Sequence, residues 1–196
     1  MKITVDFQRF LYTIKFILKG SIYMLYQTYY HSPIGKILLV SDECHLIGLW
    51  LEGQKYFAST IEKQERKSEL TPVLKQTEEW LDDYFQGKNP NSKILPLLPN
   101  GSEFQKSVWN ILGTIPYGST MTYGDIAKLL SQHRNRKVSA QAVGNAVGHN
   151  PISIIIPCHR VVGKDGNLTG YAGGIDKKIK LLELEGLNMK QFYVKK

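Results

Sequence analysis

The pattern of apolar and polar positions divides the chain into a strand-rich first half and a helix-rich second half. Three short segments in the first half read as strands separated by polar turns, and they are residues 25–30, 36–41 and 46–51. Residues 71–85 carry apolar side chains at helical spacing, with Thr71 placed to cap the helix, Pro72 in its first turn and Gly87 after its end. The first half therefore predicts an antiparallel meander and one helix.

The second half predicts mainly helix. Apolar residues recur at helical spacing in three segments, which are residues 103–112, 122–130 and 139–148. Thr122 and Ser139 occupy the positions of N-caps. A polar loop between the last two segments carries His133, Arg134, Arg136 and Lys137. Two short helices joined by such a loop indicate a helix-turn-helix.

The last of these helices, 139–148, is built from unusually small residues. We expect Ala140, Val143 and Val147 to face inward, with Gln141 on another face. Glycine costs a helix about 1 kcal/mol relative to alanine, so its use at two positions suggests that another body approaches the backbone closely. A nucleic-acid groove and a tightly packed neighbouring helix both satisfy that condition.

These patterns predict an α/β fold of the α+β type in two parts. The predicted division is an extension at 1–23, an N-terminal α/β domain at 24–87, a linker rich in proline, asparagine and glycine at 88–101, and a mainly helical domain at 102–190. Residues 1–23 are either a true extension or the product of an early start codon, with Met24 as the functional start. Charged residues interrupt their apolar run before it reaches the about 20 residues of a membrane span, so we expect no membrane contact.

Charge is concentrated in the second half. The chain of 196 residues has a formal net charge of +8. Residues 1–100 hold 12 Lys and Arg against 11 Asp and Glu, whereas residues 101–196 hold 13 against 6, so the second half has a net charge of +7. This asymmetry is typical of a half that meets a polyanion such as nucleic acid, and a basic, soluble surface explains it equally well.

Cys44 and Cys158 are far apart, and no cluster of cysteine and histidine surrounds either. We therefore expect no disulfide framework and no metal site, and we assign the chain to a reducing compartment, the cytoplasm. A cysteine within apolar sequence, such as Cys158, is usually an inert core residue. However, His159 and Arg160 follow it directly, and a neighbouring base or cation is what converts a thiol into a reactive thiolate.

The sequence around Cys158, Pro157-Cys158-His159-Arg160-Val161, resembles the active-site signature of the O6-alkylguanine-DNA alkyltransferases. Further segments resemble the family in order and spacing, and they are 104–109, 115–118, 122–124, 142–144, 150–151, 170–174 and 185–186. The resemblance is continuous from about Gly101 to Gly186, and the part from Met24 resembles the family's more variable N-terminal domain less specifically. It implies that 102–190 is a DNA-binding alkyltransferase domain.

The resemblance implies a single-turnover transferase that repairs DNA by direct reversal. Cys158 would accept the alkyl group of O6-alkylguanine, and of O4-alkylthymine, irreversibly and without a cofactor. His159 would take the thiol proton through a water, and Glu185 would orient His159, as in other relays of nucleophile, base and acid. Asn150 would be the hinge between the second helix and an active-site strand, and Tyr123 would donate toward the leaving purine.

The resemblance also implies a flipped nucleotide and a set of contacts to it. Tyr171, Ala172 and Gly173 would wall the base pocket, and the carbonyl of Val161 would accept from the exocyclic amine of the base. The helix 139–148 would enter the minor groove of double-stranded DNA, bound by a monomer. The DNA-contacting residues would be Arg134, Arg136, Lys137, Ser139, Ala140, Gln141, Gly144, Asn145 and Arg160. Family members commonly carry an arginine finger where this chain has Gln141.

Three alternatives remain open from the sequence. The first is a non-catalytic relative that recognises alkylated DNA, although such relatives lack the acceptor cysteine. The second is a helix-turn-helix regulator in which Cys158 is incidental. The third is a cysteine hydrolase that turns over repeatedly, because a thioester can be hydrolysed and a thioether cannot.

Overall fold

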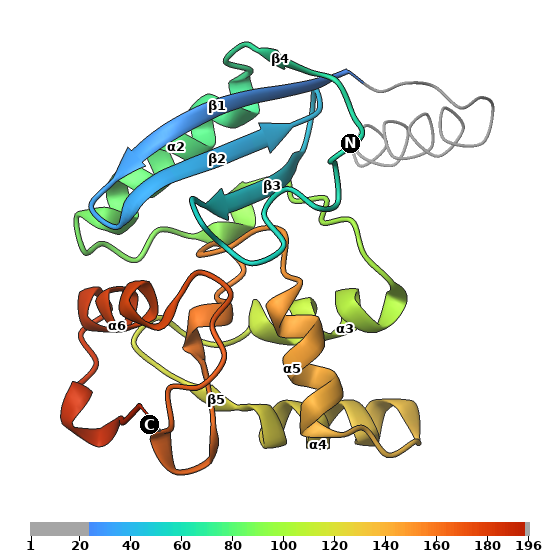
Figure 1. Ribbon diagram of the computed structural model, residues 1–196, viewed down its shortest axis with the longest axis vertical. Coiled ribbons are helices and arrows are strands. Elements are labelled where there is room, and N and C mark those ends of the chain that lie inside the picture. The colour runs from blue at the N-terminus through green and yellow to red at the C-terminus, as the bar shows by residue number, and fades with distance from the viewer. Residues whose placement is uncertain (1–23, 195–196) are drawn as a thin grey trace, which may run out of the picture.

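The computed structural model describes residues 24–194, and its two halves lie one above the other in Figure 1. The predicted extension at 1–23 lies outside the described residues. The α+β architecture is confirmed, with a small sheet and one helix in the first half and mainly helices in the second. Among residues 24–194, no helix combines the length and the apolar character that crossing a membrane requires.

The first half is a four-stranded sheet with α2 against one face (Figure 1). Its strands are β1 (Leu25–Ser32), β2 (Gly35–Ser41), β3 (Leu46–Leu51) and β4 (Arg66–Ser68) in the order β3-β2-β1-β4. β1, β2 and β3 form the predicted antiparallel meander, and the sequence pattern missed the short β4, which pairs parallel to β1. The loop between β3 and β4 supplies Ala58 and Ile61 to the other face, so β2 is buried on both sides.

Helix α2 (Pro72–Phe85) begins where the sequence predicted. The hydroxyl of Thr71 accepts a hydrogen bond from the backbone N–H of Leu74 at 3.2 Å, and the hydroxyls of Thr71 and Ser41 lie 2.9 Å apart in the core. The cap therefore satisfies an end group of the helix and also attaches the helix to β2. One apolar face of α2, which includes Leu74, Leu81 and Tyr84, then packs on the sheet.

The segment 88–101 follows the outer edge of β3 instead of running freely between the halves. Leu46 donates to the carbonyl of Pro96 at 2.8 Å and accepts from Leu98 at 2.9 Å, and Leu95 is buried. A one-turn 3-10 helix at Ser92–Ile94 precedes these bonds. The segment thereby covers half of a strand edge that would otherwise expose unpaired backbone groups.

The second half is built on four helices and a two-stranded parallel ladder. These elements are α3 (Glu103–Leu112), β5 (Met121–Thr122), α4 (Tyr123–Arg134), α5 (Ala140–Gly148), β6 (Val161–Val162) and α6 (Ile175–Leu184). Single turns of 3-10 helix occur at Cys158–Arg160, Lys164–Gly166 and Met189–Gln191. Ser102, Thr122 and Ser139 cap α3, α4 and α5 through their hydroxyls, as the sequence predicted for the last two.

Two expectations about the helix-turn-helix were wrong. Helix α4 runs to Arg134, a full turn past residue 130, because the left-handed backbone of Asn135 (φ 47°) ends it there, so His133 and Arg134 belong to the helix and not to the loop. Ala140 is exposed in the first turn of α5, and Ala146 joins Val143 and Val147 on the buried face instead. The indole N–H of Trp109 donates to the carbonyl of Ala146 at 2.9 Å, which fixes α5 against α3.

The two halves share one hydrophobic core and one strand edge. Leu49 of β3 donates to the carbonyl of Pro151 at 2.8 Å and accepts from Ser153 at 2.9 Å. The residues that lead from α5 to Cys158 therefore continue the pairing that residues 96–98 begin on the same edge. The largest core cluster runs without interruption from β2, β3 and α2 to α3, α4 and α5.

We expect Thr71→Ala to lower the free energy of unfolding by about 1–2 kcal/mol, because it removes a helix cap and leaves the Ser41 hydroxyl without its buried partner. Thr71→Ser keeps the hydroxyl and should lose less than half as much. Chemical denaturation of both variants measures the difference. An equal loss in the serine variant would assign the effect to the threonine methyl group and not to the cap.

Candidate active site

Cys158 opens the one-turn 3-10 helix Cys158–Arg160 and is 4% exposed. The expectation of a strand leading to it was wrong, although residues 154–156 are apolar and β-branched. Ile154 adopts a left-handed conformation (φ 67°), and the N–H of Cys158 bonds back to the carbonyl of Ile156 at 2.8 Å, so the chain coils tightly before the cysteine. A β-branched residue with positive φ is strained, and such strain is commonly stored at functional sites.

Asn150 holds this coil together from its centre. Its side-chain amide lies within hydrogen-bonding distance of the carbonyls of Ile152 and Ile156 at 3.2 and 2.8 Å and of the Cys158 sulfur at 3.2 Å. Its side-chain oxygen accepts from the N–H of Ile152 at 3.1 Å. The buried asparagine at the end of α5 thus orients the thiol through the backbone that carries it.

Besides Asn150, a second polar group lies near the thiol, and it is Lys178. The sequence analysis did not identify it. It is fully buried on α6, and its ammonium donates to the carbonyl of Val161. Burial lowers the pKa of Lys178 to about 8, and the neighbouring Cys158 opposes that shift. Burial raises the pKa of the Cys158 thiol, whereas the Asn150 bond and the charge of Lys178 lower it. A lysine on the apolar face of the helix, three residues before Leu181, was the signal available in the sequence.

His159 and Arg160 meet on one buried carboxylate, that of Glu185, which follows the last residue of α6. His159 Nε2 lies 2.7 Å from Glu185 Oε1. Arg160 binds both carboxylate oxygens through Nε at 2.8 Å and Nη2 at 2.9 Å, and its Nη1 donates to the carbonyl of Ile115 at 2.7 Å. Arg160 therefore points inward to Glu185, with its side chain 11% exposed, and its contact with DNA stays a prediction.

Tyr84 of α2 brings the first half of the chain into this network. Its hydroxyl donates to Glu185 Oε1 at 2.8 Å and lies 3.4 Å from His159 Nε2. The backbone N–H of Gly118 donates to Glu185 Oε2 at 3.2 Å. The sequence analysis assigned Tyr84 to the apolar stripe of its helix, and nothing in the local pattern distinguishes a tyrosine that packs from one that also donates.

The electrostatics of the network keep Glu185 ionised. Burial alone would raise its pKa, but the bonds and charges of His159 and Arg160 lower it to about 2. Burial lowers the pKa of His159, and Glu185 opposes that shift. A neutral imidazole that donates from Nε2 to Glu185 has its lone pair at Nδ1, which is buried without a hydrogen-bond partner among residues 24–194. His159 is thus arranged as a proton acceptor.

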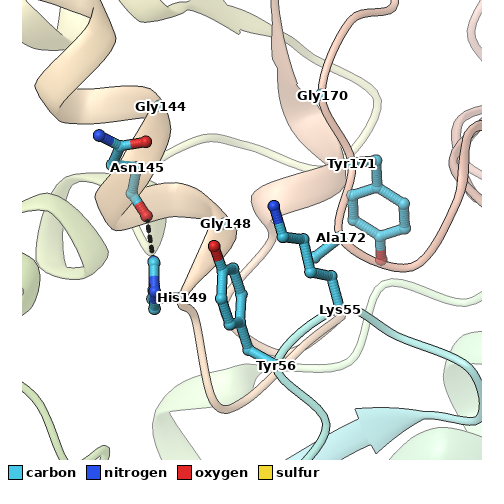
Figure 2. A pocket seen from close by; sticks show the side chains of 9 residues that line it. All are labelled: Lys55, Tyr56, Gly144, Asn145, Gly148, His149, Gly170, Tyr171 and Ala172. Atoms are coloured by element: carbon cyan, nitrogen blue, oxygen red, sulfur yellow. Dashed lines mark hydrogen bonds between the residues drawn. The ribbon is translucent and has the colours of Figure 1, made fainter.

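A pocket of about 190 Å³ lies beside this centre, between α5 and the loop at 170–172 (Figure 2). Its lining consists of Lys55, Tyr56, Gly144, Asn145, Gly148, His149, Gly170, Tyr171 and Ala172. It is smaller than the about 300–1,000 Å³ of pockets that hold drug-sized ligands. Burial raises the pKa of Tyr171 well above its ordinary value, and so does the adjacent Cys158.

Some of the predicted binding residues line this pocket, whereas others pack in the core or bond to other residues. Tyr171, Ala172, Gly144 and Asn145 line it. Gly173 is buried, and a Cβ there would lie 2.7 Å from Leu51 and from the Tyr171 ring, so this glycine permits close packing. The carbonyl of Val161 already accepts from Lys178.

The hydroxyl of Tyr123 bonds to backbone in the structure. It lies 3.0 Å from the carbonyl of Gly170 and 3.2 Å from that of Thr169, and it therefore supports the loop that carries Tyr171. Burial raises the pKa of Tyr123 to about 12, and Cys158 adds to that shift. Its ring lies 3.8 Å from the position that a Cβ on Gly144 would take, so the glycine allows Tyr123 to pack against α5.

The predicted DNA-contacting residues on α5 and its approach are largely solvent-exposed. The exposed ones are Arg134, Arg136, Lys137, Ser139, Ala140, Gln141 and Asn145. The Arg134 guanidinium lies over the Phe104 ring at 5.4 Å, which fixes its position on α4. Among residues 24–194, no group of three histidine, cysteine or acidic side chains is placed to hold a metal ion.

The chain resembles known proteins both in sequence family and in fold. Residues 25–99 match the family described as 6-O-methylguanine DNA methyltransferase, ribonuclease-like domain, and residues 103–187 match its DNA binding domain. A methylated-DNA–protein-cysteine methyltransferase from Methanosarcina acetivorans is 46% identical over 169 residues, which cover 83% of this chain and 99% of the relative. One from Haemophilus influenzae is 42% identical over 161 residues, covering 82% and 86%.

Solved structures give the same likeness. The crystal structure of the Mycobacterium tuberculosis O6-methylguanine methyltransferase superimposes with a TM-score of 0.68 at 38% identity, covering 83% of this chain and 93% of that one. A Mycobacterium tuberculosis structure in complex with DNA gives a TM-score of 0.67 at 35% identity, covering 86% and 94%.

We expect the Glu185 network to make stability depend on pH in acid. The pKa of Glu185 is lowered from 4.5 to about 2, so its contribution is present in full above pH 4.5 and is lost as the pH falls toward 2. That contribution amounts to roughly 3 kcal/mol. Denaturant unfolding from pH 7 to pH 3 should show wild type and Glu185→Gln converging as the pH falls. Glu183→Gln, an exposed change on the same helix, is the control. A constant difference across the range would contradict the assignment.

Proposed function

Because the chain belongs to the 6-O-methylguanine DNA methyltransferase family, we propose that Cys158 is the acceptor to which it transfers the alkyl group of O6-alkylguanine in DNA. The protein repairs alkylated DNA by this transfer. The observation that carries the residue assignment is a buried thiol next to a histidine that a charged carboxylate and an arginine hold in place. We assign the reaction to residues 102–190, and residues 24–87 to a supporting domain.

The transfer is a displacement at the alkyl carbon. The Cys158 sulfur forms a bond to that carbon, the bond from carbon to guanine O6 breaks, and its electron pair stays on the base. The thiol proton passes through a water to His159 Nδ1, and the departing guanine takes one proton from water. His159 later returns its proton to water, so the reaction balances without a cofactor. The thioether product is not hydrolysed, which makes the protein a single-turnover reagent for O6-alkylguanine and O4-alkylthymine.

The network around Glu185 serves to keep His159 a base. An ionised Glu185 accepts from Nε2 and fixes the tautomer, and the charge of Arg160 keeps the carboxylate ionised within the core. Lys178 favours the thiolate because its ammonium is buried near the sulfur and water screens it poorly. The charge of Lys178 counters the burial that raises the pKa of Cys158, and His159 accepts the proton that the thiol releases.

The target oxygen is inside the duplex, so the nucleotide must be flipped into the pocket beside Tyr171. Tyr171 and the backbone of Ala172 and Gly173 wall the base, and the Val161 carbonyl accepts from its exocyclic amine with the lone pair that Lys178 leaves. The exposed face of α5 enters the minor groove, and Arg134, Arg136 and Lys137 contact the flanking phosphates. We assign this activity to a monomer in the cytoplasm.

The alternatives make different demands on Cys158. A non-catalytic relative would bind alkylated DNA without needing it, and a helix-turn-helix regulator would bind a specific sequence whether or not the DNA is alkylated. A hydrolase would regenerate the free thiol. The presence of Cys158 against Asn150, Lys178 and Tyr171 favours transfer over all three.

We expect a duplex with one O6-methylguanine to add one methyl group to the peptide that contains Cys158, with at most one transfer per protein molecule. Peptide mass spectrometry and counting of the remaining lesion measure this. Cys158→Ser should transfer nothing, whereas Cys44→Ser, at the exposed second cysteine, should react like the wild type. Methylation of Cys44 or repeated turnover would refute the assignment.

We expect Gln141→Arg to strengthen binding to a duplex with O6-methylguanine, because arginine adds a cation on the exposed face of α5. The salt dependence should steepen by about one phosphate contact. Gln132→Arg, at an exposed position on α4, is the matched control for added charge. Equal gains in both variants would mean that position 141 has no special place in the groove.

A further inference from the structure

The outer part of the pocket is built by two residues of the first half of the chain that the transfer chemistry described above does not use. Lys55 and Tyr56 follow β3, and they line the pocket opposite α5 and the loop at 170–172. The N–H of Lys55 donates to the carbonyl of Ala172 at 2.9 Å. This bond attaches the loop after β3 directly to the loop that carries Tyr171.

Three side chains form a layered stack at this place. The Tyr56 ring lies against the His149 ring with centroids 3.9 Å apart and planes 21° apart. The Lys55 ammonium lies 5.0 Å from the centre of the same tyrosine ring. His149 is itself held, because its Nδ1 lies 2.7 Å from the carbonyl of Asn145 at the end of α5. The stack therefore connects the loop after β3 to the helix proposed to enter the groove.

The stack directs two hydrogen-bond donors into the pocket. In Figure 2 the ammonium of Lys55 and the hydroxyl of Tyr56 point the same way, into the space between α5 and the loop at 170–172. Lys55 is the only lysine or arginine among the nine lining residues, and none of the nine is acidic. Tyr56 has a left-handed backbone (φ 61°), a strained conformation for a tyrosine, and the bond from Lys55 helps to hold it.

Resting on the proposed function, we propose that Lys55 and Tyr56 form a phosphate-binding site for the backbone of the flipped nucleotide, with His149 as its support. The inner end of the pocket, at Tyr171, adjoins Cys158 and takes the base. The sugar and its phosphates then lie toward the outer end. An ammonium and a hydroxyl that converge there match the donors that proteins use to position a nucleic-acid backbone.

The site explains why the first half of the chain reaches the pocket. A base inserted into the pocket brings its own phosphates to a fixed distance from the thiol, and donors on Lys55 and Tyr56 hold that distance. The exposed residues of α5 bind the duplex, whereas Lys55 and Tyr56 bind only the nucleotide that has left it. Their contribution is therefore specific to the flipped state.

The test replaces single phosphates of the duplex with neutral methylphosphonates, 5′ or 3′ to one O6-methylguanine. Binding is measured in a Cys158→Ser background so that no transfer consumes the lesion. We expect Lys55→Gln to weaken binding several-fold and to lower the salt dependence by about one phosphate. At one of the two positions, the methylphosphonate should weaken binding of the parent protein but should not weaken binding of the Lys55→Gln variant further.

Tyr56→Phe keeps the ring stack and removes only the hydroxyl, and it should show the same coupling with a smaller loss. Lys36→Gln is the matched control, because Lys36 lies 4.6 Å from the Tyr29 ring in a like arrangement outside the pocket lining. Additive losses at both phosphates would overturn the proposal, and so would equal loss with Lys36→Gln. Wild-type protein that methylates Cys158 while Lys55→Gln shows no coupling would overturn this site and leave the proposed function standing.

Discussion

One buried carboxylate organises this molecule. Glu185 is 4% exposed, and an ionised group at such a position is tolerated only when hydrogen bonds and opposite charge replace the water it has lost. Five donors do so, from the side chains of Tyr84, His159 and Arg160 and from the backbone of Gly118. They come from α2, the turn before β5, and the 3-10 helix of the nucleophile. Satisfying one charge therefore fixes the relative positions of both halves of the chain and of His159.

The polar groups beside the thiol also have two tasks each. Asn150 satisfies the backbone of a strained coil and also contacts the sulfur, and Lys178 bonds to β6 and also places a charge near the sulfur. Each group therefore bonds to the backbone that carries Cys158 and also acts on the pKa of its thiol. The buried polar residues around Cys158 therefore differ both from solvated surface residues and from apolar core residues.

The sequence predicted the elements whose signals are local and missed those that depend on distant partners. The caps at Thr71, Thr122 and Ser139 and the strands β1 to β3 are marked by neighbouring residues, and all were found. The extra turn of α4 depends on the backbone of Asn135, which the residue type alone did not indicate. The coil before Cys158 pairs with β3 at Pro151 and Ser153, and it does not continue as a strand because Asn150 binds the carbonyls of Ile152 and Ile156.

The site divides in the same way. Cys158, His159, Glu185 and Asn150 lie in recognisable sequence, and the structure brings Asn150 to the Cys158 sulfur and Glu185 to His159, while their roles in the transfer stay predictions. Lys178 and Tyr84 were missed because each side chain lies on the apolar face of its helix and has a polar group only at its end. Lys55 was missed because its loop reaches the pocket only through tertiary folding. The local sequence also gave no signal that Arg160 would point toward Glu185.

The shared edge of β3 has a consequence for the order of events during folding. The bonds from Leu49 to Pro151 and Ser153 join residues about a hundred positions apart in the chain, and contacts of such long sequence separation close late because of their loop entropy. The coil that presents the thiol is built on those bonds. We therefore expect a nascent chain to complete its reactive centre only after residues of both halves have been synthesised. A protein that can use its nucleophile only once then becomes able to react only when its native state is complete.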